Sequence, residues 1–185
     1  MQASKTAQQL LTQVTKVCDE YPQHANFPVV IVNISEQKLY VYSNAEYVCE
    51  YPVSTSRFGI GQDEGSYKTP LGIHCVQEKI GDNAEFAEVF KARKRTHTCA
   101  SIEHEKKSTD EDCITSRILW LSGLEEGINK GEGVDSHARY IYIHGTQEEG
   151  LIGHAASEGC IRMNNQDVIE LYDHLVVSSL VIINK

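Results

Sequence analysis

The sequence predicts a mainly β domain, sandwich-like or barrel-like, with attached helices. Three observations predict this fold. Short apolar runs rich in β-branched and aromatic residues recur through the middle of the chain. A helical spacing of apolar residues occurs once near each end. The chain of 185 residues, 41% hydrophobic and 23% charged, has the size and composition of one globular domain.

The first element is an amphipathic helix predicted over residues 4–21. Ser4 is a candidate N-cap, and Pro22 lies just beyond the predicted end. The apolar residues at helical spacing are Leu10, Leu11, Val14 and Val17. We therefore interpret residues 1–27 as a helical extension that packs on the surface of a domain formed by residues 28–185.

That domain is predicted from short strands separated by turn-forming residues. The expected strands are Val29–Ile34, Lys38–Ser43, Glu46–Val53, Ile73–Glu78, Ile118–Ser122, Tyr140–His144 and Val176–Ile183. Glycine-rich loops are expected at 54–72 and 123–139. A second helix is expected at Asn164–Leu175, because its apolar residues repeat at helical spacing after a capping asparagine.

One segment, residues 79–115, is polar and mixed in charge, with a basic run at Lys91–Arg95 and an acidic run at Asp110–Asp112. Runs of this kind are usually solvated insertions. A long loop in a compact domain also often carries function, so a flap over a substrate groove is the alternative. The sequence leaves both interpretations of this segment open.

Charge and hydropathy exclude several partners. A net charge of −9 argues against a general nucleic-acid binder, and apolar runs such as Val29–Val32 are too short to cross a membrane. We therefore expect neither nucleic-acid nor membrane partners. Residues 1–21 lack the basic start and apolar core of a secretory signal. The sequence as given predicts a cytoplasmic protein, or a periplasmic one if a leader has been removed.

Cysteine spacing predicts no metal site. The six cysteines, none of them in a CxxC pair, are Cys18, Cys49, Cys75, Cys99, Cys113 and Cys160. They are expected to be reduced and mostly buried. His97 and Cys99, with His104 further on, match no standard zinc pattern. We therefore expect no zinc site in this segment.

The segment with the strongest chemical signal runs from Tyr140 to Met163. It places His144 at the end of a predicted strand and Cys160 ahead of a helix start. Two such residues can act as a cysteine nucleophile and its histidine base. A free thiol has a pKa of about 8.5, so a neighbouring imidazole is needed to take its proton. An ion pair would result. Gly159 and Cys160 could offer two backbone N–H groups as an oxyanion hole.

Neighbouring residues add supporting roles to this interpretation. Gly145 leaves a carbonyl free to orient the His144 ring, and Arg162 offers a cation for a substrate carboxylate. His154 is a weaker candidate base, because no glycine motif accompanies it. Glu158 would place a carboxylate near the thiol, which disfavours the thiolate unless the side chain points to solvent.

The sequence of these motifs strongly resembles that of the L,D-transpeptidase (YkuD-type) catalytic domain. The resemblance covers residues 28–184. The motifs that carry it are HGT at 144–146, SEGCIRM at 157–163, YPVST at 51–55 and KTPLG at 68–72. It implies a β-sandwich with the catalytic pair at one end of a groove. It also implies that Cys160 is the nucleophile, that His144 is the proton carrier, and that Gly159 supplies an oxyanion donor.

Further roles follow from the same resemblance. Gly145 and Ser157 would orient His144, and Arg162 would anchor substrate or brace the site. Members of the family act on peptidoglycan tetrapeptide stems. Their cysteine attacks the carbonyl of the L-centred diamino acid, and the terminal D-Ala leaves. Carbapenem-type β-lactams are expected to acylate Cys160. The resemblance also implies that neither a metal nor an organic cofactor is needed.

The acceptor that resolves the acyl-enzyme stays open. A cytoplasmic member would meet recycled wall fragments and use water, as an L,D-carboxypeptidase in murein recycling. A member with its leader removed would be an L,D-transpeptidase that forms 3–3 cross-links or exchanges D-amino acids. A third reading is a non-catalytic module that binds peptidoglycan fragments. We expect the segment 79–115 to narrow the groove and so to favour water.

Overall fold

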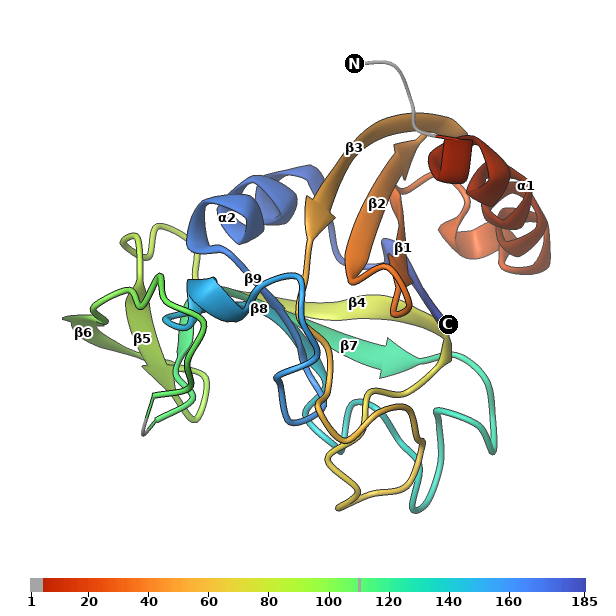
Figure 1. The fold of residues 1–185 in the computed structure, drawn as a ribbon. Coiled ribbons are helices and arrows are strands. Elements are labelled where there is room, and N and C mark those ends of the chain that lie inside the picture. The colour runs from red at the N-terminus through yellow and green to blue at the C-terminus, as the bar shows by residue number, and fades with distance from the viewer. Residues whose placement is uncertain (1–4, 110) are drawn as a thin grey trace.

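Ten strands form one hydrogen-bonded sheet that bends over itself, with a helix near each end of the chain (Figure 1). The computed structural model describes residues 5–109 and 111–185. The helices are α1 (Lys5–Glu20) and α2 (Asn165–His174), and the short 3₁₀ turns are η1 (Pro22–His24) and η2 (Glu149–Leu151). The strands are β1 (Val29–Asn33), β2 (Lys38–Ser43), β3 (Glu46–Pro52), β4 (Gly72–Ile80), β5 (Glu88–Lys91), β6 (Lys94–Cys99), β7 (Ile114–Gly123), β8 (Tyr142–Thr146), β9 (Ile161–Met163) and β10 (Leu180–Asn184). The predicted mainly β fold with two attached helices is confirmed.

The strand order explains how the two halves of the chain meet. The main path runs β3-β2-β1-β10-β4-β7-β5-β6, and β8 pairs with β7 on one side and β9 on the other. Most neighbours are antiparallel, but β1 pairs with β10 and β8 pairs with β9 in parallel. The last strand of the chain therefore lies in the middle of the sheet, between β1 and β4.

Alternating side chains give β1 and β2 two buried faces. Val30 and Val32 point to the main core, whereas Val29 and Ile31 point to the face that α1 covers. This alternation follows from the two-residue period of a strand. Helix α1 packs on that outer face with Ala7, Val14 and Val17, all of them buried. It lies at the opposite end of the molecule from β5 and β6 (Figure 1).

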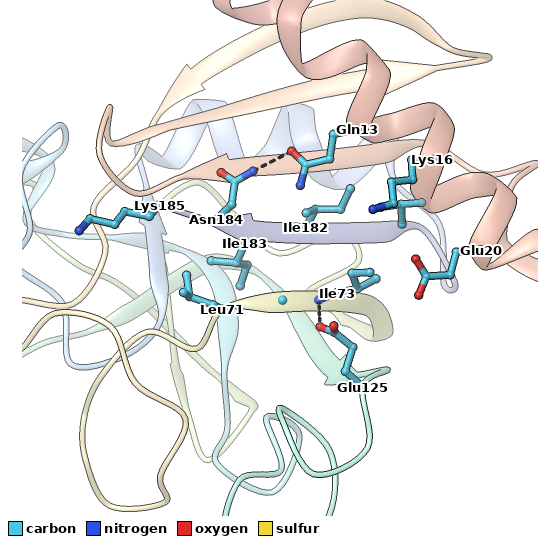
Figure 2. Close-up of a pocket in the computed structure, with 12 residues that line it drawn as sticks. Gln13, Lys16, Glu20, Leu71, Ile73, Glu125, Ile182, Ile183, Asn184 and Lys185 are labelled. Carbon is cyan, nitrogen blue, oxygen red and sulfur yellow. Dashed lines mark hydrogen bonds between the residues drawn. The ribbon is translucent and has the colours of Figure 1, made fainter.

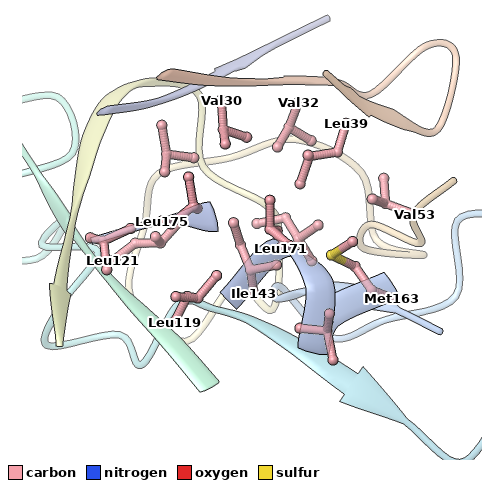
Figure 3. Close-up of a cluster of buried hydrophobic side chains, with 14 of the residues drawn as sticks. Val30, Val32, Leu39, Val53, Leu119, Leu121, Ile143, Met163, Leu171 and Leu175 are labelled. Carbon is pink, nitrogen blue, oxygen red and sulfur yellow. The ribbon is translucent and has the colours of Figure 1, made fainter. Parts of the chain in front are cut away.

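The main core lies between the β1–β2 end of the sheet and the β7–β9 end (Figure 3). Figure 3 shows Val30 and Val32 facing Leu119 and Ile143 across the cluster, with Leu171 of α2 among them. Fully burying one such aliphatic side chain contributes about 1.5–3 kcal/mol. Side chains of β8 and β9 are part of this core, so burial on their inner face stabilises the position of both strands.

Several predicted boundaries were wrong, each for a local reason. The segment 79–115 was expected to be irregular, yet it contains the hairpin β5–β6. The strand β9 was not predicted. Strand β8 begins two residues later than expected, since Tyr140 has a φ of +58°, and β10 begins at Leu180 because residues 176–179 form a turn. The predicted cap Ser4 lies outside the described residues.

The cysteines are less buried than predicted. All six are free, but only Cys75 is fully buried, and Cys99 is exposed. The other four are partly exposed. In the described part of the chain, no helix is long and apolar enough to span a bilayer.

Candidate active site

Strands β8 and β9 place the two residues of the predicted catalytic pair on one face. Ile143 and Ile161 are register partners, and both point into the main core. Because side chains alternate along a strand, His144 on β8 and Cys160, one residue before β9, point to the opposite face. Cys160 packs there against a smaller apolar cluster that includes Trp120 and Tyr142.

The Cys160 sulfur is held by the backbone of the segment that leads into β8. Its Sγ accepts a hydrogen bond from the Tyr142 N–H at 3.4 Å and donates to the Tyr140 carbonyl at 3.3 Å. Residue 160 as a whole is partly exposed. Packing around the sulfur nevertheless raises the pKa of the thiol to about 12, chiefly through burial. The resting sulfur is therefore a thiol.

The His144 ring is buried and fixed in one tautomer. Its Nδ1 lies 2.7 Å from the Gly145 carbonyl, which only accepts hydrogen bonds, so Nδ1 carries the proton. No described residue pairs with Nε2, which is left to accept a proton. Burial lowers the pKa of the ring, and Asp112 partly opposes that shift. The resting ring is therefore neutral at physiological pH.

These two shifts correct the expected ion pair. No hydrogen bond joins the Cys160 sulfur to the His144 ring among the described residues. The raised pKa of the thiol and the lowered pKa of the imidazole both favour the uncharged forms. The arrangement suits general-base catalysis, in which the ring takes the thiol proton as the bond to a substrate carbonyl forms.

The turn that carries Cys160 is held by hydrogen bonds from within the turn and from the glycine-rich loop. Ser157 Oγ donates to the Cys160 carbonyl at 2.6 Å and so holds this turn, and among the described residues no hydrogen bond joins it to the His144 ring, which it was predicted to orient. Thr69, from the KTPLG motif, donates to the Gly159 carbonyl at 3.0 Å. Gly159 has a φ of +121°, which favours glycine.

One of the two predicted oxyanion donors is engaged in the resting structure. The Gly159 N–H donates to Ser157 Oγ at 3.3 Å, a long contact. No hydrogen bond from the Cys160 N–H is found within residues 5–109 and 111–185. Gly159 must therefore give up its contact with Ser157 before it serves as a donor, whereas the Cys160 N–H is already free.

Arg162 is the register partner of His144 on β9, and carboxylates occupy both of its terminal nitrogens. It is 2% exposed, and it pairs with Glu148 at 2.7 Å and with Asp112 at 2.5 Å. Glu148 also accepts hydrogen bonds from the N–H and the hydroxyl of Thr109. Both terminal guanidinium nitrogens are therefore taken, which fits the bracing role and leaves the predicted binding of a substrate carboxylate without a free donor pair.

Two residues that the sequence flagged near Cys160 form no hydrogen bond with its sulfur among the described residues. Glu158 forms an ion pair with Arg57 at the surface, and Arg57 stacks over the Phe58 ring at 5.0 Å. The Glu158 carboxylate is therefore compensated. His154 is exposed in the turn after η2, and no described contact joins its ring to Cys160.

A pocket of about 250 Å³ lies between the glycine-rich loop and the segment before β8, and neither Cys160 nor His144 lines it. Its lining residues are Glu64, Gly65, Tyr67, Ala138, Arg139, Tyr140, Ile141 and Glu158. Tyr140, whose carbonyl accepts from the Cys160 sulfur, forms part of this wall. A second pocket, of about 430 Å³, lies between α1 and the adjoining ends of β4 and β10, and neither Cys160 nor His144 lines it (Figure 2).

Sequence reasoning missed several residues that shape the site. Thr69, Arg139 and Tyr142 each lie within the contacts described for the Cys160 turn or its pocket. Asp112 and Glu148 were missed as partners of Arg162. The one available signal was the KTPLG motif, which contains Thr69. Within the described residues, no group of three or more histidine, cysteine or acidic side chains is placed to hold a metal ion.

Comparison with known sequences gives one family. The model of the L,D-transpeptidase catalytic domain (YkuD) matches residues 28–183. A curated relative, YkuD of Bacillus subtilis (strain 168), which is named as an L,D-transpeptidase, is 51% identical over 43 residues. That stretch covers 23% of this chain and 26% of the relative, so it compares only a quarter of either protein.

Comparison with solved structures gives the same fold. L,D-transpeptidase 3 from Mycobacterium tuberculosis, in complex with a faropenem-derived adduct, aligns with a TM-score of 0.54 at 16% identity. The alignment covers 85% of this chain and 60% of that one. An L,D-transpeptidase variant from Enterococcus faecium aligns with a TM-score of 0.50 at 12% identity, over 85% of this chain and 50% of that one. The chain thus spans between half and three fifths of these structures.

Proposed function

The chain belongs to the L,D-transpeptidase catalytic domain family, and on this premise we propose that it is a cysteine-nucleophile acyl-transfer enzyme acting on peptidoglycan stems. It cleaves the bond between the L-centre of the diamino acid and the terminal D-Ala of a tetrapeptide. Water is the acceptor, so the activity is that of an L,D-carboxypeptidase in murein recycling, in the cytoplasm. The observation that carries the proposal is the placement of Cys160 and His144 on one face of the β8–β9 pair, the face that points away from the main core.

The first half-reaction starts from the neutral pair. The Cys160 sulfur attacks the carbonyl carbon of the diamino acid while His144 Nε2 takes the thiol proton. The Cys160 N–H donates to the developing oxyanion, an interaction worth roughly 3–4 kcal/mol of barrier where it has been measured. The imidazolium then gives its proton to the amine of D-Ala as the carbon–nitrogen bond breaks. A thioester and free D-Ala result.

The second half-reaction restores the thiol. His144 Nε2 takes a proton from water as the water oxygen attacks the thioester carbonyl. The carbon–sulfur bond breaks and the proton passes to the sulfur, so the products are a tripeptide acid and the original Cys160 thiol. The hydrogen bond from Nδ1 to the Gly145 carbonyl, at 2.7 Å, keeps Nε2 available in both halves.

Two features support water as the acceptor. The pocket next to the Cys160 turn, lined by Tyr140 and Glu158, holds about 250 Å³, less than the roughly 300–1,000 Å³ typical of drug-sized ligand sites. It is therefore better matched to one peptide segment than to two. The hairpin β5–β6, from the segment 79–115, also brings Arg93 over the rings of Trp120 and Tyr140, next to the apolar cluster against which Cys160 packs, and so narrows the approach to this face.

The same nucleophile is proposed as the target of carbapenem-type β-lactams. Among the solved structures with this fold, one contains imipenem and another a faropenem-derived adduct. Opening of a β-lactam ring by the Cys160 sulfur would leave an acyl adduct that intact-protein mass spectrometry detects. The adduct should be absent from Cys160→Ala protein.

Product analysis tests the proposed function. Purified protein is incubated with the tetrapeptide stem, with and without an added D-amino acid, and products are identified by mass spectrometry. Formation of tripeptide and D-Ala alone supports hydrolysis. A tetrapeptide that carries the added D-amino acid identifies an amine acceptor and overturns the choice of water.

Cysteine variants provide the matched control. Cys160→Ala should abolish turnover, whereas Cys99→Ala, at an exposed thiol on β6, should leave turnover unchanged. Full turnover in Cys160→Ala protein would overturn the enzymatic proposal. Binding of the stem without any turnover by the wild-type protein would identify a binding module instead.

A further inference from the structure

A carboxypeptidase substrate ends in a carboxylate, and the predicted anchor for it is already occupied. The terminal nitrogens of Arg162 pair with Glu148 and Asp112. Only its Nε lacks a partner, and that atom is buried. A carboxylate on the substrate therefore needs another cation near the Cys160 sulfur.

Arg93, in the turn of the β5–β6 hairpin, is a cation held on this face. Its guanidinium lies 4.8 Å from the ring centroid of Trp120 and 5.1 Å from that of Tyr140. It also donates to the Tyr142 hydroxyl at 3.3 Å. These contacts fix the plane of the guanidinium, since a cation is attracted to an aromatic face.

The same two tyrosines hold the nucleophile. Cys160 Sγ contacts the backbone of Tyr140 and Tyr142, while Arg93 contacts their side chains. The sulfur and the guanidinium thus share these two residues as neighbours, the sulfur at their backbone and the guanidinium at their rings. In the substrate, the terminal carboxylate follows the attacked carbonyl by one residue, roughly 3.5 Å of chain. The cation that binds it must therefore lie near the sulfur, and Arg93 stacks on the Trp120 ring of the apolar cluster against which Cys160 packs.

Arg93 also has unused binding capacity. It forms no ion pair with a carboxylate in the described part of the chain, and it is partly exposed. Glu78, whose charge acts on Arg93, contacts the His137 ring at 3.4 Å. A guanidinium has five N–H donors, and one bond to Tyr142 leaves enough of them for a carboxylate.

The other arginine near the sulfur is used differently. Arg139 lines the 250 Å³ pocket, but it donates to the Lys68 carbonyl at 2.7 Å and to Gly61 and Ser66 at longer distances. It therefore fastens the glycine-rich loop to the segment before β8. Of the two, Arg93 has the greater number of free donors.

We propose that Arg93 binds the terminal carboxylate of the substrate and so selects peptides that end one residue after the attacked bond. This proposal rests on the proposed function, because it assigns the substrate class of the same site. The hairpin β5–β6 then acts as a specificity element, and Arg93 touches the leaving residue. A charge-assisted, two-pronged contact of this kind is expected to discriminate by about 10- to 100-fold.

The test compares two substrates that differ only at the last carboxyl group. The tetrapeptide acid and its C-terminal amide are offered to the wild-type protein and to Arg93→Ala and Arg93→Lys variants. The wild type should prefer the acid by about 10- to 100-fold in kcat/KM. Arg93→Ala should bring this preference close to one, mainly through KM for the acid. Arg93→Lys should keep part of it, as a point charge without the planar fork.

The neighbouring residue supplies a matched control. Lys94→Ala removes one positive charge from the same hairpin at an exposed position, and it should leave the acid preference unchanged. Thermal unfolding of each variant checks that the hairpin still folds. An Arg93→Ala variant that folds and retains the full preference for the acid overturns the proposal. Equal loss in the Lys94→Ala variant also overturns it, because general charge would then explain the effect.

A binding measurement separates failure of this proposal from failure of the proposed function. Calorimetric affinities for both peptides are measured with Cys160→Ala protein and with the Cys160→Ala/Arg93→Ala double variant, so no turnover is involved. Tighter binding of the acid only when Arg93 is present supports the assignment even if the wild type turns over neither peptide. Equal affinities for acid and amide in Cys160→Ala protein overturn it.

Discussion

The ion pairs of Arg162 give a sharp prediction about stability. Arg162→Met removes the guanidinium but keeps an unbranched side chain of similar length. The substitution leaves Glu148 without its partner, and the Glu148 side chain is 4% exposed. It also frees Asp112, whose side chain is 38% exposed and so remains within reach of water.

The magnitude follows from the burial of the two partners. Removing one member of a buried ion pair typically costs about 3–5 kcal/mol, because the other charge is left uncompensated. The exposed partner Asp112 adds little, since exposed pairs contribute about 0–1 kcal/mol. For 185 residues at roughly 2.1 cal/mol/K each, the unfolding entropy is near 0.4 kcal/mol/K. The expected fall in Tm is therefore about 8–13 °C.

Thermal unfolding followed by circular dichroism measures this shift. The double variant Arg162→Met/Glu148→Gln should recover more than half of the loss, because an amide in place of the carboxylate removes the unpaired charge. Asp112→Asn should lower Tm by less than about 3 °C. If Arg162→Met lowers Tm by less than 2 °C, or if the double variant recovers none of the lost Tm, Arg162 does not stabilise the fold through its buried ion pair with Glu148.

Three further predictions concern the catalytic pair and its support. The acid limb of kcat/KM should lie below the ordinary histidine pKa of about 6.5, because burial lowers the pKa of His144; Asp112→Asn should move the limb to still lower pH, since Asp112 raises that pKa. Alkylation of Cys160 by iodoacetamide, mapped by peptide mass spectrometry, should be slow at pH 7 and accelerate up to its pKa of about 12; rapid labelling at pH 6 would indicate an ion pair instead. Gly145→Ala should lower Tm, because a Cβ there would lie 2.7 Å from the Thr115 carbonyl; unchanged thermal unfolding would contradict the close approach of β8 to β7.

Strands made of consecutive apolar and aromatic residues were predictable from sequence. For β2 the predicted range Lys38–Ser43 is the observed one, since its four consecutive apolar residues, all of them buried, are bounded by short turns. The hairpin β5–β6 was missed because β6, KRTHTC, is exposed along almost its whole length. An edge strand of this kind carries no hydrophobic period, so nothing in its composition distinguishes it from a loop.

The candidate site divides in the same way. Cys160 and His144 could be identified because glycines and a motif surround them in one stretch of sequence. The environment that sets their pKa values could not, because its charges come from elsewhere: Asp112 precedes β7, and Arg162 lies in β9. For the same reason, the sequence could not show that Arg162 is already paired, and so it predicted that Arg162 would bind substrate. Whether an arginine is free or paired depends on carboxylates that only the folded chain brings to it.

The charges of Asp112 and Arg162 also explain why burial controls the protonation of Cys160 and His144. Asp112 raises the pKa of both His144 and Cys160, and Arg162 lowers both. Because these two residues form an ion pair at 2.5 Å, their effects on each catalytic group oppose one another. Burial remains as the dominant influence, and it favours the neutral thiol and the neutral imidazole. A stem peptide that carries carboxylates then approaches an uncharged nucleophile, and charge separation begins only when its carbonyl carbon reaches the sulfur.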